Sequence, residues 1–333
     1  QTGVLTVDGA TDITANGGDK NIILNTQENV LTGAVSLDGH NVRLINSKAL
    51  ELGELASKAL ILTARDAVTQ SASNKIKSDG SSTITAQNIA GNINYDITLT
   101  NTSNDFYDDT GVGDELKIIG KDVQLASGDQ INMGASTITG NLTLTSSDTI
   151  TDNDITTVAG NFSATTTANN GAITLDSLAV TTNSSDADGE IALQTHGSGN
   201  ATVVNANGLD FAASSVGGAL SATATLGNIT QGSGALTITG TSTFQTDADG
   251  SNIVLNSASN AFSSWVKMKA DDGGASSTGN ETFGNIEFVD SGAVVIQTSA
   301  ATDADGELLI DAGTDGAVGG NLSITATTGN ITQ

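Results

Sequence analysis

The sequence predicts an all-β protein, a β-solenoid of stacked coils, and three observations lead to this prediction. Apolar residues alternate with Ser, Thr and Asn over short runs, one long pattern recurs along the chain, and only 3% of the residues are aromatic. Alternation with a period of two is typical of a half-buried strand. A β-sandwich core would need more large aromatic side chains, whereas the thin core of a solenoid is filled by small ones.

The recurring pattern is roughly eighty residues long and occurs in four imperfect copies. We place the copies at residues 1–69, 70–151, 152–230 and 231–333 of a single solenoid. An opening motif such as GALTITGTSTF (234–244) precedes a second motif, which reads NIILNTQENVLTG from Asn21, YDITLTNTSNDFYD from Tyr95 and SNIVLNSASNAFSS from Ser251. The third motif reads NVRLINSKALELG from Asn41, DVQLASGDQINMG from Asp122, ATVVNANGLDFAA from Ala201 and NIEFVDSGAVVIQ from Asn285. Closing runs such as LGNITQ (226–231) and GNLSITATTGNITQ (320–333) complete the copies.

Within each copy, the alternating positions hold Thr, Val and Ile, whose β-branched side chains suit a pleated surface. Gly and Asn recur about every ten residues, where the chain must turn. The strongest helix candidate by composition is segment 49–64, ALELGELASKALILTA, which is rich in good helix formers. We expect strands there as well, because the segment aligns with the strand-like segment 122–145. The lack of proline agrees with a ladder that uses nearly every backbone N–H.

The runs GALTITGTSTF, SNIVLNSASNAF and GNLSITATTGNITQ resemble the repeats of filamentous-haemagglutinin-type exoproteins. These are large bacterial surface and secreted proteins, often exported by two-partner secretion, and the resemblance covers nearly the whole chain. It implies a right-handed parallel β-helix, an extracellular location and a role as a fibre, adhesin shaft or surface layer. The secretion-signal and effector or anchor domains of that family are not recognisable. Both ends lie at one phase of the repeat, which we expect of a segment of a longer array.

Charge and composition argue against several functions. With a net charge of −26 and no basic patch with interleaved aromatic residues, the chain is not expected to bind nucleic acid. Without cysteine it forms no disulfide, no cysteine-ligated zinc site and no thiol nucleophile. No apolar run is long enough for a membrane-spanning helix, so no such helix is expected.

The motif DADG is a candidate metal site. It occurs at 186–189, 247–250 and 303–306, and a glutamate follows the first and third copies. Carboxylates two residues apart, beside a glycine that allows a tight turn, can converge on Ca²⁺ as hard oxygen ligands. The alternative is that Asp and Gly only form turns between strands. We expect no other cofactor, and the candidate Ca²⁺ ligands are Asp186, Asp188, Glu190, Asp247, Asp249, Asp303, Asp305 and Glu307.

Two irregular segments are candidates for lateral contacts with a partner. Phe106 and Tyr107 precede the run DDTGVGDELK, and Phe262 and Trp265 lie in AFSSWVKMKADDGG. Irregular segments of a solenoid are where binding functions are usually placed. The alternative is that these aromatic side chains stack on the core beneath a loop.

Catalysis and ice binding are lesser alternatives. Parallel β-helices also include enzymes that act on polysaccharides, and such sites need clustered carboxylates near a cation. The two histidines, His40 and His196, lie far apart in turn-like contexts, and we expect no catalytic residue. An ice-binding face needs Thr-x-Thr on successive coils, whereas Thr-x-Thr occurs about once per repeat.

These features together predict a non-catalytic structural protein. We expect it to form an extracellular or cell-surface filament by head-to-tail continuation of the solenoid, because open coil ends leave backbone groups unpaired. The alternative is the rod-like shaft of a bacterial adhesin. Its expected partners are itself or neighbouring repeats, and in addition other cell surfaces or glycans.

Overall fold

The computed structural model of the chain describes residues 1–107, 114–181, 189–232, 234–270, 284–297, 307–310 and 320–333. These residues form strands β1 to β36, and no helix occurs among them. They fall into two compact units, unit 1 (Gln1–Gly160) and unit 2 (Asn161–Gln333). Each unit is described by itself.

Unit 1 contains two parallel sheets, and the chain alternates between them. Its first sheet contains β1 (Thr6–Val7), β3 (Ile22–Leu31), β5 (Asn41–Asn46), β7 (Ala59–Ala64), β10 (Ser82–Ala86), β12 (Leu116–Gly120), β14 (Ile131–Met133), β15 (Ser136–Ile138), β17 (Ile150–Asp152) and β18 (Thr156–Val158). Its second sheet contains β2 (Thr11–Thr14), β4 (Val35–Asp38), β6 (Leu50–Ser57), β8 (Val68–Gln70), β9 (Ile76–Ser78), β11 (Ile97–Leu99), β13 (Val123–Ser127) and β16 (Leu142–Ser146). Each coil of the chain passes once through the first sheet and once through the second.

Unit 2 repeats this arrangement. Its first sheet contains β20 (Ile173–Val180), β22 (Ala201–Asn205), β25 (Leu220–Ala224), β28 (Ser242–Thr246), β31 (Val266–Ala270), β33 (Val294–Gln297), β34 (Glu307–Ile310) and β36 (Ile331–Thr332). Its second sheet contains β19 (Phe162–Asn169), β21 (Glu190–His196), β23 (Leu209–Phe211), β24 (Ser214–Val216), β26 (Ile229–Gln231), β27 (Leu236–Ile238), β29 (Ile253–Leu255), β30 (Ala261–Phe262), β32 (Ile286–Asp290) and β35 (Leu322–Ala326).

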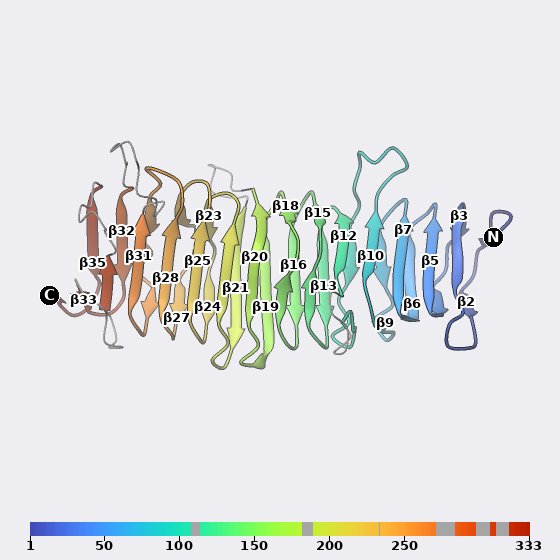
Figure 1. The fold of residues 1–333 in the computed structure, drawn as a ribbon, viewed down its shortest axis with the longest axis horizontal. Coiled ribbons are helices and arrows are strands. Elements are labelled where there is room, and N and C mark those ends of the chain that lie inside the picture. Colours follow the sequence, from blue (N-terminus) through green and yellow to red (C-terminus); the bar gives the residue numbers. More distant parts are fainter. Residues whose placement is uncertain (108–113, 182–188, 233, 271–283, 298–306, 311–319) are drawn as a thin grey trace. The chain divides into compact units, whose positions relative to one another are not determined.

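Neighbouring strands of each sheet pair in parallel, one coil apart, as Figure 1 shows for the strands of each unit. In unit 1, Leu44 of β5 lies beside Leu62 of β7. In unit 2, Ala222 of β25 lies beside Phe244 of β28. Apolar core residues therefore stack on apolar core residues. The predicted all-β solenoid of stacked coils is confirmed.

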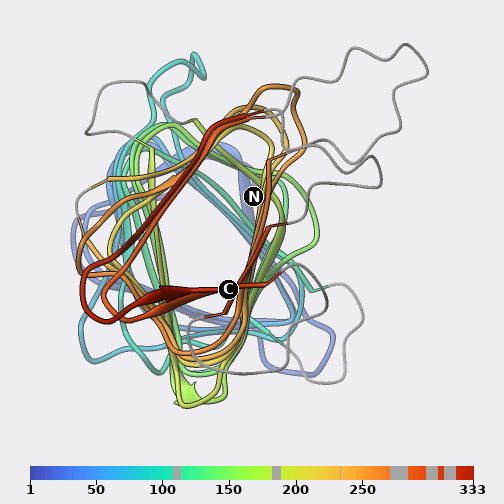
Figure 2. The same cartoon turned by 90° about the vertical axis from the view of Figure 1, so that its left-hand side faces the viewer.

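The core of each unit lies between its two sheets, which face each other in the view along the coils (Figure 2). Side chains alternate along each strand, so that in β7 the residues Leu60, Leu62 and Ala64 are buried and those between them are half-buried. Most core residues are Leu, Ile, Val or Ala. This agrees with a thin core that needs few large side chains.

Segment 49–64, the composition-based helix candidate, forms β6 and β7, as the alignment with 122–145 predicts. Gly53 lies inside β6, and an added Cβ there would come 2.3 Å from Ser36 Oγ of the neighbouring strand. Packing against neighbouring coils therefore overrides the intrinsic helix preference of Ala, Leu, Glu and Lys.

In successive copies within a unit, the same motif lies in opposite sheets. In unit 1, the third motif starts on β5 of the first sheet at Asn41 and directly before β13 of the second sheet at Asp122. In unit 2, it starts on β22 of the first sheet at Ala201 and directly before β32 of the second sheet at Asn285. Within either unit the chain changes sheet seven times between the two starts. One repeat therefore spans three and a half coils.

Candidate functional site

Side chains of asparagine and aspartate connect successive coils at one corner. In unit 2, the Oδ1 atom of Asn228 accepts a hydrogen bond from the backbone N–H of Asn252 at 2.8 Å. Asn252 accepts in the same way from Asn285 at 2.7 Å, and Asn285 from Asn321 at 2.8 Å. Each of these residues directly precedes a strand, where the backbone N–H lies just outside the sheet ladder. The corner amides therefore satisfy a backbone donor of the next coil and fix its register.

Unit 1 has an equivalent ladder that contains aspartates. Asp96 accepts from the N–H of Asp122 at 3.3 Å, and Asp122 accepts from the N–H of Asn141 at 2.9 Å. The hydrogen bond from Asn141 and the ammonium group of Lys121 lower the pKa of Asp122 below its ordinary value. A carboxylate at this position is therefore held ionised by the same backbone donor that the amides of unit 2 engage.

A second recurring contact is a pair of side-chain amides, a half-buried glutamine and a buried asparagine. In unit 1, Gln70 donates from Nε2 to Oδ1 of Asn104 at 2.6 Å, and Asn104 donates back from Nδ2 to Oε1 of Gln70 at 3.0 Å. The N–H of Ile76 also donates to Asn104 Oδ1 at 2.9 Å, and Asn104 Nδ2 reaches the carbonyl of Ala126 at 3.2 Å. This fully buried amide therefore connects several coils at once.

The same pair recurs in unit 2. Gln231 and Asn260 exchange two hydrogen bonds of 2.7 and 3.0 Å, and the N–H of Leu236 donates to Asn260 at 2.9 Å. Gln70 and Gln231 both end a closing strand, and both asparagines lie in the second motif of the following copy. In the first copy the corresponding residues are Gln1 and Asn29, whose side chains are in contact. The Gln–Asn pair is thus a recurring feature of the repeat.

A third buried polar position ends the first strand of the third motif. It is occupied by Asn46, Ser127, Asn205 and Asp290, all of them buried. Asn46 and Asn205 each accept a backbone N–H of the preceding coil, at 2.9 and 2.8 Å.

Asp290 occupies the same position with a carboxylate, which accepts from the N–H of Phe262 at 3.2 Å and of Gly292 at 3.3 Å. Burial raises the pKa of Asp290 above its ordinary value of 3.8, against the opposing effect of these hydrogen bonds. Of the four copies, this one alone places an ionisable group there.

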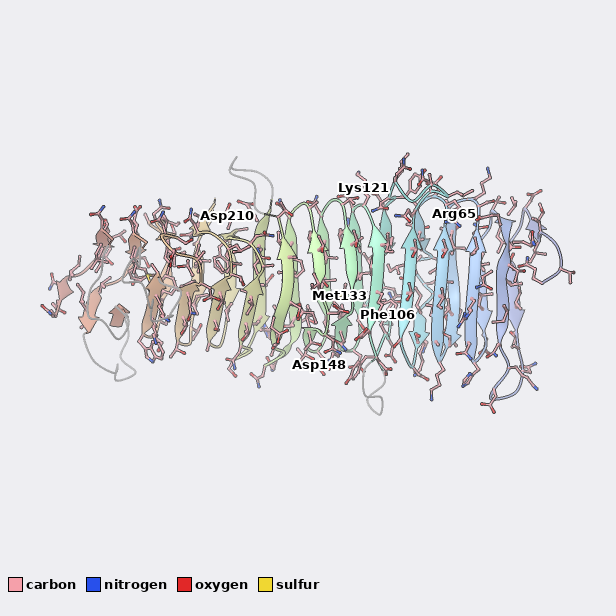
Figure 3. The ribbon with its side chains drawn as sticks, turned by 45° about the horizontal axis from the view of Figure 1, so that its top comes forward. Arg65, Phe106, Lys121, Met133, Asp148 and Asp210 are labelled. Atoms are coloured by element: carbon pink, nitrogen blue, oxygen red, sulfur yellow. The ribbon has the colours of Figure 1, made fainter. Side chains whose placement is uncertain are left out.

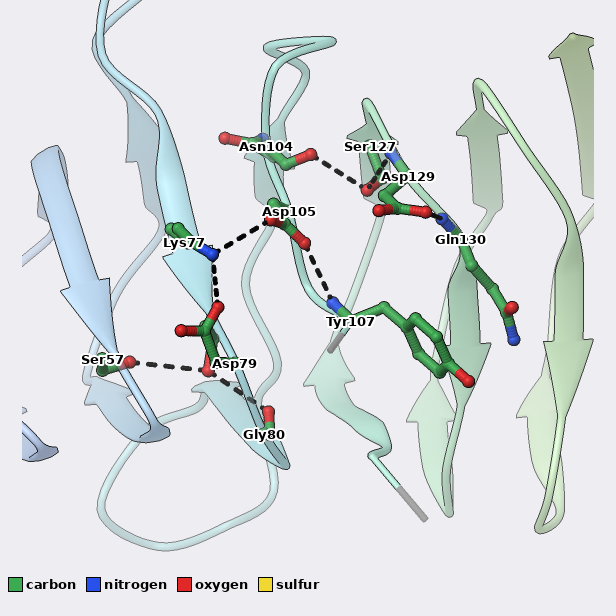
Figure 4. A network of polar contacts seen from close by, with 11 residues as sticks. Ser57, Lys77, Asp79, Gly80, Asn104, Asp105, Tyr107, Ser127, Asp129 and Gln130 are labelled. Atoms are coloured by element: carbon green, nitrogen blue, oxygen red, sulfur yellow. Dashed lines mark hydrogen bonds and ion pairs between the residues drawn. The ribbon is translucent and has the colours of Figure 1, made fainter. Parts of the chain in front are cut away.

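Charged side chains of unit 1 form small surface networks. Lys77, on β9, lies 2.5 Å from Asp79 and 3.6 Å from Asp105 (Figure 4). The hydrogen bond to Asp79 is the main cause that raises the pKa of Lys77. Arg65 forms a two-pronged contact with Glu28 at 2.8 Å, and its place is shown in Figure 3. These pairs are partly exposed, so each adds little to stability.

A hollow of about 420 Å³ lies at a corner of unit 1, lined by Asp38, His40, Lys58, Lys77 and Asp79. The Nε2 atom of His40 is 3.8 Å from Asp19 Oδ1, beyond hydrogen-bonding distance. In unit 2, His196 ends β21 and is exposed. The hollow thus combines both charge signs, and a hydrogen bond of 3.0 Å joins the Nδ1 atom of the His40 ring to Asn41 Nδ2.

The candidate calcium ligands are only partly described. Asp186, Asp188, Asp303 and Asp305 lie outside the described residues, as does the side chain of Glu307 in β34. Glu190 lies beside Asp210 across β21 and β23. Asp247 accepts from Gln245 Nε2 at 2.6 Å, and Asp249 lies in the following turn. Within the part of the chain that the structure describes, no three ligand-type side chains cluster to hold a metal ion, and calcium binding stays a prediction.

The four candidate contact aromatics separate into two kinds. Phe106 (Figure 3) and Phe262 are core residues, 2% and 5% exposed, so their rings are not presented to a partner. Phe262 stacks between Phe244 and Phe288 at ring-centroid distances of 6.1 and 5.3 Å. Tyr107 and Trp265 remain partly exposed. The placement of the two phenylalanines follows from strand alternation, which continues through the bend and points every second side chain inward.

The outward rows of the sheets are chemically mixed. In unit 1, Thr83 of β10 has Ile61 on one side and Lys117 on the other, at constant phase. A continuous rank of threonine is therefore interrupted on both neighbouring coils.

Among the described strands, those at two edges pair on one side only. In unit 1 these are β1 and β2, and in unit 2 they are β35 and β36. Leu322 and Ile331 lie beside Ile286 and Val294, which are buried, yet they are 44% and 47% exposed. Residues 320–333 carry no charged side chain. The edge of unit 2 is therefore an uncharged, partly apolar strand edge.

Among the described residues, which form no helix, nothing could serve as a helical membrane span.

Comparisons with known proteins identify the repeat itself. A family model described as repeats of unknown function (DUF5649) matches residues 1–38, 39–112, 120–196 and 198–269, which is most of the chain. No curated protein and no solved structure matches. The matched ranges begin close to the third motif, at 39, 120 and 198, rather than at the closing runs. The chain belongs to this family of repeats of unknown function, DUF5649.

Proposed function

We propose that this chain is a non-catalytic structural protein that builds a filament outside the cell or on its surface. Coils of one copy stack on coils of the next, and the partner is a further copy of the repeat array. The proposal requires no cofactor. The observation that carries it is that, within each unit, the strand that closes one copy pairs in parallel with the second motif of the next copy, with Val68 beside Ile97 in unit 1 and Ile229 beside Ile253 in unit 2.

Unpaired backbone groups at a sheet edge are a template for another strand. Solenoid coils contact only their neighbours, so one more coil covers the edge and leaves an equivalent edge behind. A contact between two different surfaces that does not close on itself yields an open filament. The fold therefore sets no limit on the length of a filament that grows by end-to-end stacking.

The extracellular location rests on the resemblance of the repeats to filamentous-haemagglutinin-type exoproteins. A net charge of −26 also keeps copies apart laterally, because like charges repel. The proposal is thus of a fibre that grows lengthwise.

Electron microscopy and sedimentation of the purified chain test this proposal. We expect filaments whose length grows with protein concentration. Ile331→Asp, which places a charge at an inward position of β36, should shorten them. Leu226→Asp is the matched control, because Leu226 is 64% exposed and lies in a turn of unit 2. A chain that stays monomeric at all concentrations would contradict the proposal, and rods that carry a distinct head would favour an adhesin shaft instead.

A further inference from the structure

A trough of about 380 Å³ lies on the outer face of the second sheet of unit 2. Strands β19, β21, β24 and β27 contribute to it, and they follow one another along the unit in Figure 1. At one phase of these strands the outward side chains are Thr165, Gln194, Ser215 and Thr237, each beside the next. Neighbouring strands lie about 4.8 Å apart, so these side chains form a straight row of hydroxyl and amide groups along the coil axis.

The trough is hollow because small side chains lie where the strands bend. Strand β21 is continuous, whereas the next two coils are broken into β23 and β24 and into β26 and β27. Ala192, Ala213 and Ala235 line the trough at this bend. The buried Ser214 holds the bend, since its Oγ atom accepts the N–H of Leu193 at 3.1 Å. The trough is therefore preformed, which lowers the entropic cost of binding.

The polar groups of the row are not engaged by the protein itself. Gln194, Ser215 and Thr237 are exposed and Thr165 is half-buried. Within the described part of the chain, none of these four side chains forms a hydrogen bond or an ion pair. Hydroxyl and carboxamide groups can both donate and accept hydrogen bonds. The row is therefore free to bind a ligand that carries groups of the same kind.

The lining of the trough restricts the class of ligand. Among the described residues that line it, none is ionisable and none is aromatic, although the chain has a net charge of −26. A charged ligand would find no counter-ion there, and an aromatic ligand would find no ring on which to stack.

A peptide strand is an equally poor match. Strand addition needs the free backbone groups of a sheet edge, whereas the trough lies on a sheet face, whose backbone groups pair within the ladder. The volume lies within the range of about 300–1,000 Å³ that is usual for ligand sites. What matches this lining is an uncharged ligand rich in hydroxyl groups.

We propose that this trough binds a neutral, linear oligosaccharide that lies along the coil axis. The side chains of Gln194, Ser215 and Thr237 donate hydrogen bonds to its hydroxyl groups and accept hydrogen bonds from them. The inference goes beyond a structural role, because it gives the side of the solenoid a binding function. In a filament the trough would recur in every copy of the chain, so that several weak contacts act together on one polysaccharide.

Calorimetric titration tests the proposal with two uncharged probes, oligomers of β-1,4-linked glucose and of β-1,4-linked N-acetylglucosamine. We expect heat of binding with at least one of them. Gln194→Ala combined with Thr237→Ala should weaken that binding at least about tenfold, because the ligand loses hydrogen bonds at two places in the row. Both side chains are exposed, so the melting temperature should stay unchanged.

A second variant fills the trough without removing a polar group. Ala213→Leu should also weaken binding at least tenfold, whereas the matched control Ala206→Leu should not, because Ala206 is an exposed alanine of unit 2 outside the trough. Absence of heat with both probes, or equal losses from Ala213→Leu and Ala206→Leu, would overturn the proposal. Equally tight binding of an acidic oligogalacturonate would overturn the assignment to neutral ligands. Filament formation, followed by microscopy, is a separate measurement, so failure here leaves the proposed function standing.

Discussion

Asn104 is a small amide in the centre of a largely aliphatic core, and its contacts explain why it is there. Its Oδ1 atom accepts from Gln70 and Ile76, and its Nδ2 atom donates to Gln70 and Ala126. Buried polar groups are stable only when they are hydrogen-bonded, and a fully satisfied one fixes its surroundings. Asn260 makes the same contacts in unit 2. What recurs in the repeat is therefore a buried asparagine that holds neighbouring coils together, and not a surface feature.

Asn104→Ala should destabilise unit 1 by about 2–4 kcal/mol, because Gln70 and the N–H of Ile76 lose a buried partner. Hydrogen exchange at the amide of Ile76 measures the effect locally and should accelerate strongly. Asn16→Ala is the control, since Asn16 is exposed. Unchanged protection at Ile76 would contradict the locking role.

Asp290 should make unit 2 sensitive to pH. Burial raises its pKa in the folded state, so the folded protein binds more protons than the unfolded one between the ordinary value of 3.8 and the raised value. Its contribution to stability is therefore greatest below pH 3.8 and is lost as the pH rises through the raised pKa. Asp290→Asn, which restores the amide found at Asn46 and Asn205, should be more stable at neutral pH and less dependent on pH.

Urea unfolding followed by the fluorescence of Trp265, the only tryptophan, reports on unit 2 and measures this difference between about pH 3 and pH 7. Asp249→Asn, measured without calcium, is the control, because it removes one exposed charge of unit 2 without changing the core. If both variants change stability equally, the effect belongs to net charge and not to the buried site.

At the scale of the strands, stacked like residues carry the fold. The rings of Phe211, Phe244, Phe262 and Phe288 form a row through unit 2, with T-shaped contacts at 6.1 Å between the first three. Most of the described core is aliphatic, and Phe211 and Phe244 are among its largest fully buried side chains. Edge-to-face pairs add to the free energy of burial.

Phe244→Ala should cost about 3–5 kcal/mol, because it leaves a cavity between two rings, whereas Phe244→Leu should cost under about 1.5 kcal/mol. The urea midpoint reported by Trp265 measures both, since Phe244 contacts Phe262 close to that residue. Equal losses for the two variants would show that ring stacking, and not the filled volume, holds these coils.

The strands were predictable from the sequence because alternation survives in almost every copy, and alignment between copies resolved segment 49–64 correctly. For Phe106 and Phe262, the sequence left packing on the core open as the alternative to a lateral contact, and both side chains are buried in the core. Phe262 follows Asn260 by two positions, and both point inward. Because Asn260 is polar, the run from Asn260 to Phe262 resembles a surface segment in the sequence, although it points inward. The buried asparagines did leave a signal, since Asn29, Asn104 and Asn260 recur in the second motif, but composition alone assigns Asn to turns.

For the whole chain, the net charge of −26 is the dominant electrostatic fact. Self-repulsion destabilises the compact state, and salt screens it. The melting temperature should therefore rise when NaCl is raised from about 10 to about 500 mM. A fall would show that attractive pairs such as Arg65–Glu28 outweigh the repulsion.

Calcium and magnesium at equal ionic strength separate screening from specific binding. If the DADG motifs hold Ca²⁺, calcium should raise the melting temperature more than magnesium does, and calorimetric titration should show heat. Asp247→Asn combined with Asp249→Asn should reduce that heat. Equal effects of both ions, without heat, would contradict calcium binding.

The sequence predicted coils and copies but not how the copies are placed on the coils. The period within a motif shows in its residues, whereas the number of sheet changes per copy depends on which corners are tight and which carry insertions. Residues 87–94 show this, because they leave the coil and return through an antiparallel bridge between Gln87 and Asn94. Insertions of this kind change the length of a repeat without altering the number of times that the chain changes sheet.

The half-integer number of coils per repeat constrains how such a gene can lengthen. Duplication of one repeat would turn everything after it by half a coil, so that later motifs would exchange sheets and any surface used for binding would move to the opposite side. Duplication of two repeats together adds a whole number of coils, so every later motif stays in its original sheet. Arrays of this family that present a binding face should therefore differ from their relatives by even numbers of repeats.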